Sequence, residues 1–211
     1  MTEVAAVTPS EPSESSDRHR ERMARKKAIQ DERIAQATQE KGLIIVHTGA
    51  GKGKTTAALG LIFRALGHGL RVGVVQFTKG ARTSGEAAFA RELPGRVDFF
   101  AMGEGFTWET QDRDRDRAAA ERAWSKACEL MADPSYHLLV FDEINIVLRD
   151  ETLPVAAVLA ALRSKPDQLH VVLTGRSAHP DIVELADLVT EMKLVKHPFR
   201  AGIKAQRGIE F

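Results

Sequence analysis

The stretch from Leu43 to Leu59, LIIVHTGAGKGKTTAAL, constrains the fold of this chain more than any other. Its first five residues are mostly large and apolar or β-branched and predict a buried strand, and the alanine-rich run from about Thr55 favours a helix. Glycine alternates through the turn between them, and it allows backbone conformations that a Cβ forbids. Successive N–H groups of such a turn can point at one anion, at the positive end of the new helix. The stretch therefore predicts a phosphate-binding loop.

The same turn matches the Walker A pattern G-x-x-x-x-G-K-[ST] at Gly53, Lys54 and Thr55, whereas the first glycine of the pattern falls on Thr48. In this pattern the lysine reaches along the triphosphate and the threonine hydroxyl takes a place on Mg²⁺. The alternative is a glycine-rich turn with a chance Gly-Lys pair, which the second lysine and the strand–helix context disfavour. We expect a nucleoside triphosphate to bind at this loop.

Length and composition limit the remaining possibilities. The 211 residues suffice for one α/β domain and an extension. The 30 basic and 29 acidic residues nearly balance, so no nucleic-acid partner is expected. The single cysteine, Cys128, excludes an internal disulfide framework and fits a reducing compartment. Since we find neither a membrane-spanning apolar run nor a secretory leader, we expect no membrane partner and a cytoplasmic location.

Before the loop, the composition changes twice. Residues 1–17 are rich in Ser, Pro, Glu and Thr, and we expect a disordered tail. Residues 18–41 are charged, lack Gly and Pro, and predict a helix with only a weak apolar stripe. Such a helix is either a solvated tether or a segment that docks on a partner subunit. Residues 42–211 are expected to form the phosphate-loop domain.

Strand and helix patterns alternate through the rest of the chain. Strands are predicted at residues 71–77, 96–100, 137–143, 169–176 and 188–195, and helices at residues 84–93, 117–132, 152–162 and 179–187. This alternation predicts an α/β fold with a mainly parallel sheet covered on both faces. Cys128 shares a helical stripe with Trp124, which indicates a small core residue rather than a nucleophile.

Two carboxylates, Asp142 and Glu143, follow an apolar strand and resemble a Walker B segment that would hold Mg²⁺. The alternative is a helix-capping aspartate and a solvated glutamate. Because Glu143 also suits a γ-phosphate reaction, a kinase or a motor ATPase stays open on these residues alone. Phe106 and Trp108 lie in a loop without periodicity; they either anchor that loop or form a flat wall for a large planar ligand.

Six segments together resemble the P-loop class of ATP:corrinoid adenosyltransferases: TGAGKGKTTAALG, VGVVQFTKG, GFTWETQ, VFDEIN, LTGR and VKHPFRAGIKAQRGIEF. The resemblance covers about residues 18–211. It implies a RecA-like P-loop fold and transfer of the 5′-deoxyadenosyl group from ATP to a reduced corrinoid, with release of triphosphate. That corrinoid is cob(I)yrinic acid a,c-diamide or cob(I)alamin, in adenosylcobalamin biosynthesis or salvage. The alternatives are a P-loop kinase or NTPase acting on another substrate, and a non-enzymatic nucleotide switch.

The resemblance also implies roles for individual residues. Thr55 and Glu143 would hold Mg²⁺ or Mn²⁺, supported by Asp142. Lys54 and Arg176 would stabilise the leaving triphosphate. The residues implied in nucleotide binding are Gly49, Ala50, Gly51, Lys52, Gly53, Lys54, Thr55 and Thr56, with His197 as a weaker contact.

On the corrinoid side, the resemblance implies that Phe106 and Trp108 displace the lower axial ligand of the cobalt. A flavoprotein or another reductant would then supply the electron that takes cob(II) to cob(I). The resemblance also implies a homodimer in which the N-terminal helix lies over the partner's site. That implication favours the docking reading of residues 18–41 over the solvated tether.

Overall fold

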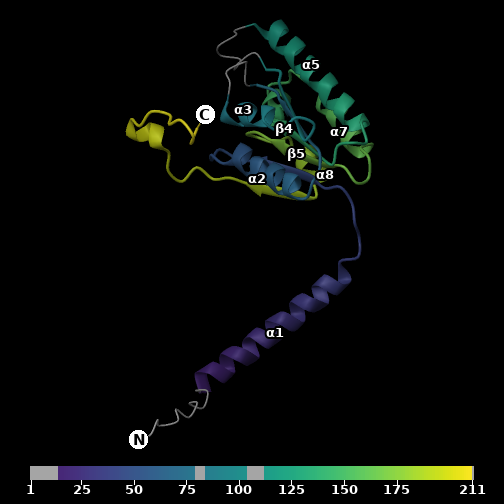
Figure 1. Ribbon diagram of the computed structural model, residues 1–211. Helices are drawn as coiled ribbons and strands as arrows, with labels where there is room; N and C mark the ends of the chain where they lie inside the picture. The colour runs from purple at the N-terminus through teal and green to yellow at the C-terminus, as the bar shows by residue number, and fades with distance from the viewer. Residues whose placement is uncertain (1–13, 79–83, 104–111, 211) are drawn as a thin grey trace, which may run out of the picture. The chain divides into compact units, whose positions relative to one another are not determined.

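The computed structural model describes residues 14–78, 84–103 and 112–210, and it divides into two compact units, Met1–Glu40 and Lys41–Phe211. The first unit contains α1 (Glu14–Gln36), where the sequence predicts a helix from residue 18 to residue 41 (Figure 1). Its few large apolar side chains, Met23, Ile29 and Ile34, are all exposed. A Lys27–Asp31 ion pair at 2.8 Å joins successive turns, as i,i+4 pairs do on solvated helices.

In the second unit, the described residues form a parallel six-stranded sheet in the order β3-β2-β4-β5-β1-β6. The strands are β1 (Ile44–Thr48), β2 (Val72–Gln76), β3 (Val97–Ala101), β4 (Leu138–Asp142), β5 (His170–Thr174) and β6 (Leu188–Glu191). The phosphate-loop strand β1 and the carboxylate strand β4 both border β5. Because all strands run the same way, their carboxyl ends meet at one edge. The predicted α/β fold with a mainly parallel sheet is confirmed.

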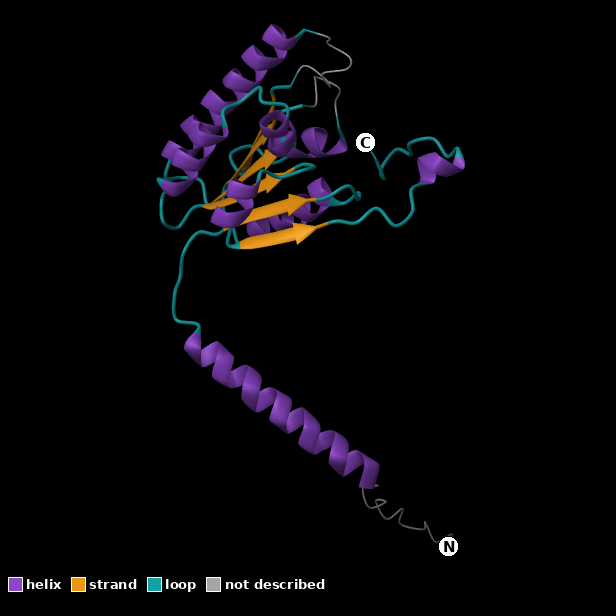
Figure 2. Ribbon diagram, turned by 180° about the vertical axis from the view of Figure 1, so that it is seen from behind, coloured by secondary structure: helices purple, strands orange, loops and turns teal. Residues whose placement is uncertain are grey.

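Helices cover both faces of this sheet, as Figures 1 and 2 show. One face carries α2 (Lys54–Gly67) and α3 (Gly85–Arg91), and the other carries α5 (Arg113–Ala132), α6 (Ile144–Arg149), α7 (Val155–Arg163) and α8 (Pro180–Leu185). A short 3₁₀ helix, η1 (Pro198–Ala201), lies in the C-terminal segment. Every residue of β2 and β4 is buried. Their sequences are therefore mostly apolar, as is usual for strands of a parallel sheet that is covered on both faces.

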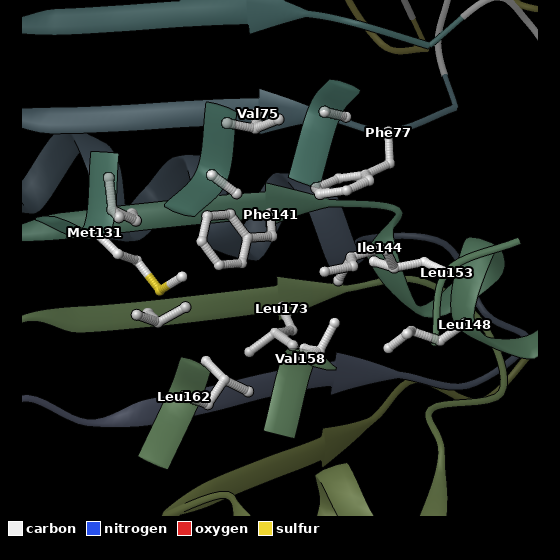
Figure 3. Packing of buried hydrophobic residues seen from close by; sticks show 14 of the residues in the cluster. Val75, Phe77, Met131, Phe141, Ile144, Leu148, Leu153, Val158, Leu162 and Leu173 are labelled. Carbon is white, nitrogen blue, oxygen red and sulfur yellow. The ribbon is translucent and has the colours of Figure 1, made fainter. Parts of the chain in front are cut away.

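The larger core cluster centres on Phe141, which is fully buried (Figure 3). Its ring meets Phe77 edge to face at 6.3 Å and Trp124 at 6.1 Å. Trp124 and Cys128 are partly buried against this cluster, so the predicted core-facing stripe of α5 is observed. Burial raises the pKa of the Cys128 thiol, which disfavours the thiolate that a nucleophile needs.

Three differences from the predicted elements of the second unit stand out. The sequence analysis did not predict α6, a two-turn helix directly after β4. α5 begins at Arg113, earlier than predicted, because the Asp112 carboxylate caps it by accepting a hydrogen bond from the Arg115 N–H at 3.1 Å. β6 ends at Glu191, before the predicted residue 195, since the next residues turn toward the phosphate loop. Among the described residues, no helix is both long enough and apolar enough to cross a membrane.

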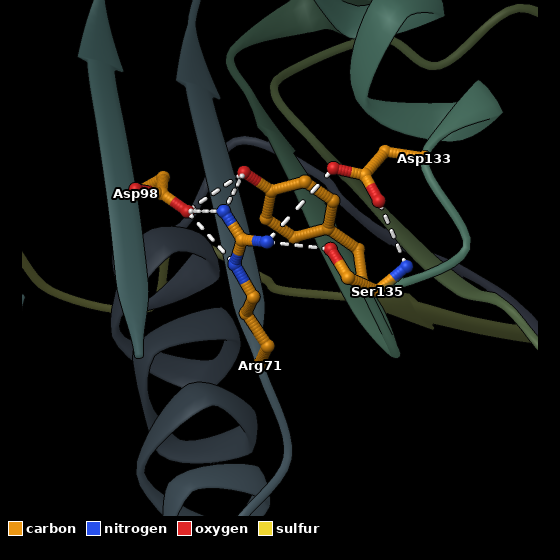
Figure 4. Close-up of polar contacts among 5 residues, drawn as sticks. Arg71, Asp98, Asp133 and Ser135 are labelled. Carbon is orange, nitrogen blue, oxygen red and sulfur yellow. Dashed lines mark hydrogen bonds and ion pairs between the residues drawn. The ribbon is translucent and has the colours of Figure 1, made fainter. Parts of the chain in front are cut away.

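A polar cluster fastens the opposite, amino-terminal edge of the sheet (Figure 4). Arg71 precedes β2 and donates two hydrogen bonds to one carboxylate oxygen of Asp98 in β3, at 2.8 and 3.2 Å. The Tyr136 hydroxyl donates to the same oxygen at 2.7 Å, and the Arg71 guanidinium lies 4.3 Å from the Tyr136 ring centroid. Burial would raise the pKa of Asp98, but the hydrogen bonds from Tyr136 and Arg71 lower it below its ordinary value.

Replacing Tyr136 with phenylalanine should lower the free energy of unfolding by about 1 kcal/mol at neutral pH, because one hydrogen bond to a carboxylate is lost. Burial and the bond to Asp98 raise the pKa of Tyr136 to about 12. The neutral hydroxyl therefore stabilises the fold below pH about 10, the value for an unfolded tyrosine, and this stabilisation is lost as the pH rises toward 12. Urea unfolding across this range should show the free energies of unfolding of the natural protein and the variant converging. A constant difference would contradict the stabilising role of the Tyr136 hydroxyl.

Candidate nucleotide-binding site

The phosphate loop lies between β1 and α2, at the carboxyl edge of the sheet. Gly49 and Gly53 have φ values of 95° and 107°, a region that favours glycine. A Cβ at Gly49 would lie 2.5 Å from the carbonyl oxygen of Met192, and one at Gly51 would lie 2.7 Å from that of Lys193. The Gly51 N–H also donates to the Met192 oxygen at 2.6 Å. The alternating glycines are therefore required where the chain that leaves β6 crosses the loop.

Lys54 is held beneath this loop and is only 6% exposed. Its Nζ donates to the carbonyl oxygens of Gly49 at 2.9 Å and Gly51 at 2.6 Å. Burial lowers the pKa of Lys54, and the nearby Glu143 carboxylate partly opposes that shift. The loop thus positions one desolvated ammonium group, which interacts with an anion more strongly than an exposed one.

Asp142 joins three elements at the floor of the site and is 1% exposed. Its Oδ1 accepts hydrogen bonds from the hydroxyls of Thr55 at 2.8 Å and Thr174 at 2.7 Å, and its Oδ2 accepts from the Gln76 amide at 2.9 Å. The structure therefore brings two of the three predicted metal-site residues, Thr55 and Asp142, into contact. It adds Gln76 and Thr174, which end the two strands on either side of β4. The sequence analysis gave these two residues no role.

Glu143 follows in the left-handed region, with φ 63°, a costly conformation for a residue other than glycine. Its N–H donates to the Thr174 hydroxyl at 2.9 Å. Gly175, with φ 128°, lies so close that a Cβ there would be 2.9 Å from the Cβ of Asn145. The turn after β4 is thus fitted closely to the end of β5, and it places Glu143 beside the phosphate loop.

The phosphate loop and Glu143 line a cavity of about 520 Å³, within the range of small-molecule sites. The wall includes loop residues 51–56, Glu143 and the exposed Arg176. Two further segments contribute that the sequence analysis missed: Gly85 and Glu86 at the start of α3, and residues 208–210 near the C-terminus. The sequence analysis gave neither segment a role in the site, although residues 208–210 lie in one of the six quoted segments, because each reaches the site only through the tertiary fold.

Other predicted site residues lie elsewhere. Gly49 and Ala50 precede the cavity-lining part of the loop, where Gly49 contributes the carbonyl that holds Lys54. His197 caps η1 through its Nδ1, which accepts from the Phe199 N–H at 3.1 Å, and it is not among the residues that line the cavity. Its nucleotide contact therefore stays a prediction. Phe106 and Trp108 fall outside the described residues.

The oxygen donors at the floor fit a magnesium ion. Mg²⁺ takes one or two protein carboxylates and completes its shell with substrate phosphates and waters. Among the described residues, no group of three or more His, Cys, Asp or Glu side chains could hold a metal by itself. The Thr55 hydroxyl, Asp142 and Glu143 match the sparser set that a phosphate-bound ion requires.

Known proteins resemble this chain over nearly its whole length. The sequence model of the family ATP:corrinoid adenosyltransferase BtuR/CobO/CobP matches residues 40–211. The chain belongs to the ATP:corrinoid adenosyltransferase family. A second model, cob(I)alamin adenosyltransferase N terminal, matches residues 8–34, so the extension that contains α1 is also a family feature.

Three relatives within the family share about half of their residues with this chain. A corrinoid adenosyltransferase of Pseudomonas aeruginosa is 58% identical, over 94% of this chain and 98% of that protein. One of Sinorhizobium sp is 53% identical over 100% of both chains. One of Escherichia coli (strain K12) is 47% identical over 93% of this chain and 100% of that protein. The resemblance on the six sequence segments is thereby confirmed.

Proposed function

We propose that this protein transfers the 5′-deoxyadenosyl group of ATP to the cobalt of a reduced corrinoid and releases triphosphate. Family membership supports the reaction class. The observation that carries the proposal is the buried Lys54, beside the Thr55–Asp142 hydrogen bond, on the wall of a 520 Å³ cavity. This arrangement suits a reaction whose leaving group is the whole triphosphate.

The step consists of one bond forming and one breaking. The electron pair of cob(I) forms the Co–C bond at the ribose C5′, and the C5′–O bond electrons leave with the triphosphate. No proton has to be removed from the nucleophile, which agrees with a cavity built of phosphate-binding groups. A leaving group with about four negative charges is stabilised by preorganised donors at the site where that charge develops.

We assign separate roles in binding and stabilising the triphosphate to the residues at this cavity. The loop amides and Lys54 would bind the phosphates, and Arg176, at the end of β5, would neutralise charge on the leaving group. Thr55 and Glu143 would hold Mg²⁺, and Asp142 would orient the Thr55 hydroxyl through their 2.8 Å bond. When bound, Mg²⁺ would supply further charge neutralisation to the triphosphate.

A direct test is to identify the products from ATP, Mg²⁺ and chemically reduced cobalamin. We expect the absorbance change of Co–C bond formation together with an equal amount of inorganic triphosphate. ADP or phosphate, with a constant corrinoid spectrum, would contradict the proposal and favour a P-loop kinase or NTPase. Repeating the assay with cobinamide and with the a,c-diamide would identify the preferred corrinoid.

Trp108 provides a prediction on the corrinoid side. We propose that Phe106 and Trp108 displace the lower axial ligand, which eases reduction of cob(II) by a flavoprotein or another protein reductant. Trp108→Ala should then lower the rate from cob(II) by about tenfold, since a large aromatic contact is lost, and should change the rate from pre-reduced cob(I) much less. Parallel assays with the two cobalt states measure this ratio; equal losses would contradict the displacement role.

The assembly and location of the protein also stay proposals. We infer a homodimer in which α1 of one subunit covers the site of the other, since the N-terminal family model includes most of this helix. Light scattering compares the mass of the full chain with that of a chain lacking residues 1–40, and the dimer should depend on the extension. The nucleotide site should depend on it as well, so the shortened chain should bind ATP more weakly. The cytoplasmic location stays a prediction from the single cysteine.

A further inference from the structure

The C-terminal segment places a carboxylate in the wall of the triphosphate cavity. Gly208, Ile209 and Glu210 line the same cavity as the phosphate loop. The Oε2 atom of Glu210 lies 2.6 Å from the Nζ atom of Lys52, the exposed lysine of that loop. Unlike Glu143, which is assigned to the metal, Glu210 would oppose an anion bound in this cavity, since like charges at close range repel.

A local turn aims Glu210 at the loop. The N–H groups of Ile209 and Glu210 both donate to the carbonyl oxygen of Gln206, at 3.2 and 2.9 Å. Gly208 allows the turn through its φ of 79°, and the Gln206 amide donates to the Lys204 carbonyl at 2.9 Å. The Glu210 side chain is only 20% exposed, whereas Lys52 is 51% exposed. The turn therefore presents the Glu210 carboxylate to the loop, and the carboxylate is the more buried member of the pair.

The chain that leads to this turn is weakly attached. Val195, Phe199 and Ile203 are 93%, 77% and 51% exposed. Apart from the bond between Lys52 and Glu210, the hydrogen bonds found for residues 195–210 join residues of that same segment. In the described part of the chain, the Lys52–Glu210 pair is the hydrogen bond that joins residues 196–210 to the rest of the domain. Within the described residues, this exposed ion pair is therefore the polar link between the turn and the loop.

We infer that Glu210 competes with the triphosphate for Lys52, so that binding of the anion releases the C-terminal turn from the phosphate loop. The inference rests on the proposed function and adds a role for the tail. A triphosphate on the loop would bring about four negative charges beside the Glu210 carboxylate. Lys52 then exchanges one carboxylate for a more highly charged partner. When the triphosphate leaves as product, Glu210 returns to Lys52 and opposes its rebinding.

The first test measures the affinity for inorganic triphosphate with Mg²⁺ by calorimetry. Glu210→Gln should bind triphosphate up to about fivefold more tightly than the natural chain, the upper end of what an exposed ion pair contributes. The difference should shrink as KCl is raised, because salt screens exposed charges. Glu184→Gln removes an equally charged, exposed side chain of α8 outside the cavity wall, and it should leave the affinity unchanged.

The second test follows the tail itself by limited trypsin digestion after Lys204 and Arg207. Triphosphate should speed cleavage of the natural chain, and Glu210→Gln should be cut at the faster rate without any ligand. Protection by triphosphate would mean that the tail closes over the anion, and it would overturn the inference. So would equal affinities of the natural chain and Glu210→Gln, or no binding of triphosphate to either.

These outcomes separate the inference from the proposed function. Equal triphosphate affinities together with normal formation of adenosylcorrinoid would remove the role of Glu210 and leave the reaction standing. Tighter binding by Glu210→Gln together with no adenosyl transfer would support the role of Glu210 and contradict the reaction.

Discussion

Lys54→Ala should lower adenosyl transfer by about 10²- to 10³-fold, the usual cost of removing one preorganised electrostatic donor. Lys54 is 6% exposed and two loop carbonyls fix its ammonium group, so no water or neighbouring side chain can readily take its place. The loss should appear in turnover at saturating ATP, because the charge on the triphosphate increases as the C5′–O bond breaks. Corrinoid absorbance measured at several ATP concentrations gives this value.

Lys52→Ala is the matched control in the same loop. Lys52 carries the same charge but is 51% exposed and pairs with Glu210, so its removal should change turnover only a few-fold. Thermal unfolding of both variants checks that the loop still folds. Turnover of Lys54→Ala within fivefold of the natural protein would contradict the assignment of the phosphate site.

Asp142→Asn should lower turnover by about 10- to 100-fold, as expected when a residue that supports a metal ligand is changed. The asparagine has nearly the same size, and the Gln76 amide can rotate to meet it, so the change removes mainly the negative charge. The Asp142 carboxylate accepts hydrogen bonds from the Thr55 hydroxyl at 2.8 Å and from the Thr174 hydroxyl at 2.7 Å. In this variant, turnover should fall and the concentration of Mg²⁺ that gives half-maximal rate should rise.

Asp150→Asn supplies the control for this second variant. Asp150 lies at the end of α6 and pairs with the exposed Arg149, outside the cavity wall, so both turnover and Mg²⁺ dependence should stay unchanged. A fall in turnover of Asp142→Asn without any change in Mg²⁺ dependence would contradict a supporting role toward the metal. It would leave a purely structural role, visible as a lower melting temperature.

Several features of this site could be predicted from sequence because they are local. Strand, glycine turn and helix follow one another within residues 43–59, and their geometry is set by backbone sterics and helix propensity. The carboxylates after β4 are also local, since they end an apolar strand. The short α6 was missed because its residues continue the apolar run of β4, and periodicity does not separate a short buried helix from a strand.

The amino-acid sequence by itself determined the parallel α/β class, the phosphate loop and, through its resemblance, the family. Only the tertiary structure decided that β5 lies between β1 and β4, that Asp142 accepts from both Thr55 and Thr174, and that Glu210 reaches Lys52. The physical reason is the range of the interactions. Turn geometry and propensity act between neighbours in the chain, whereas these contacts depend on strand order, which the packing of the whole sheet sets.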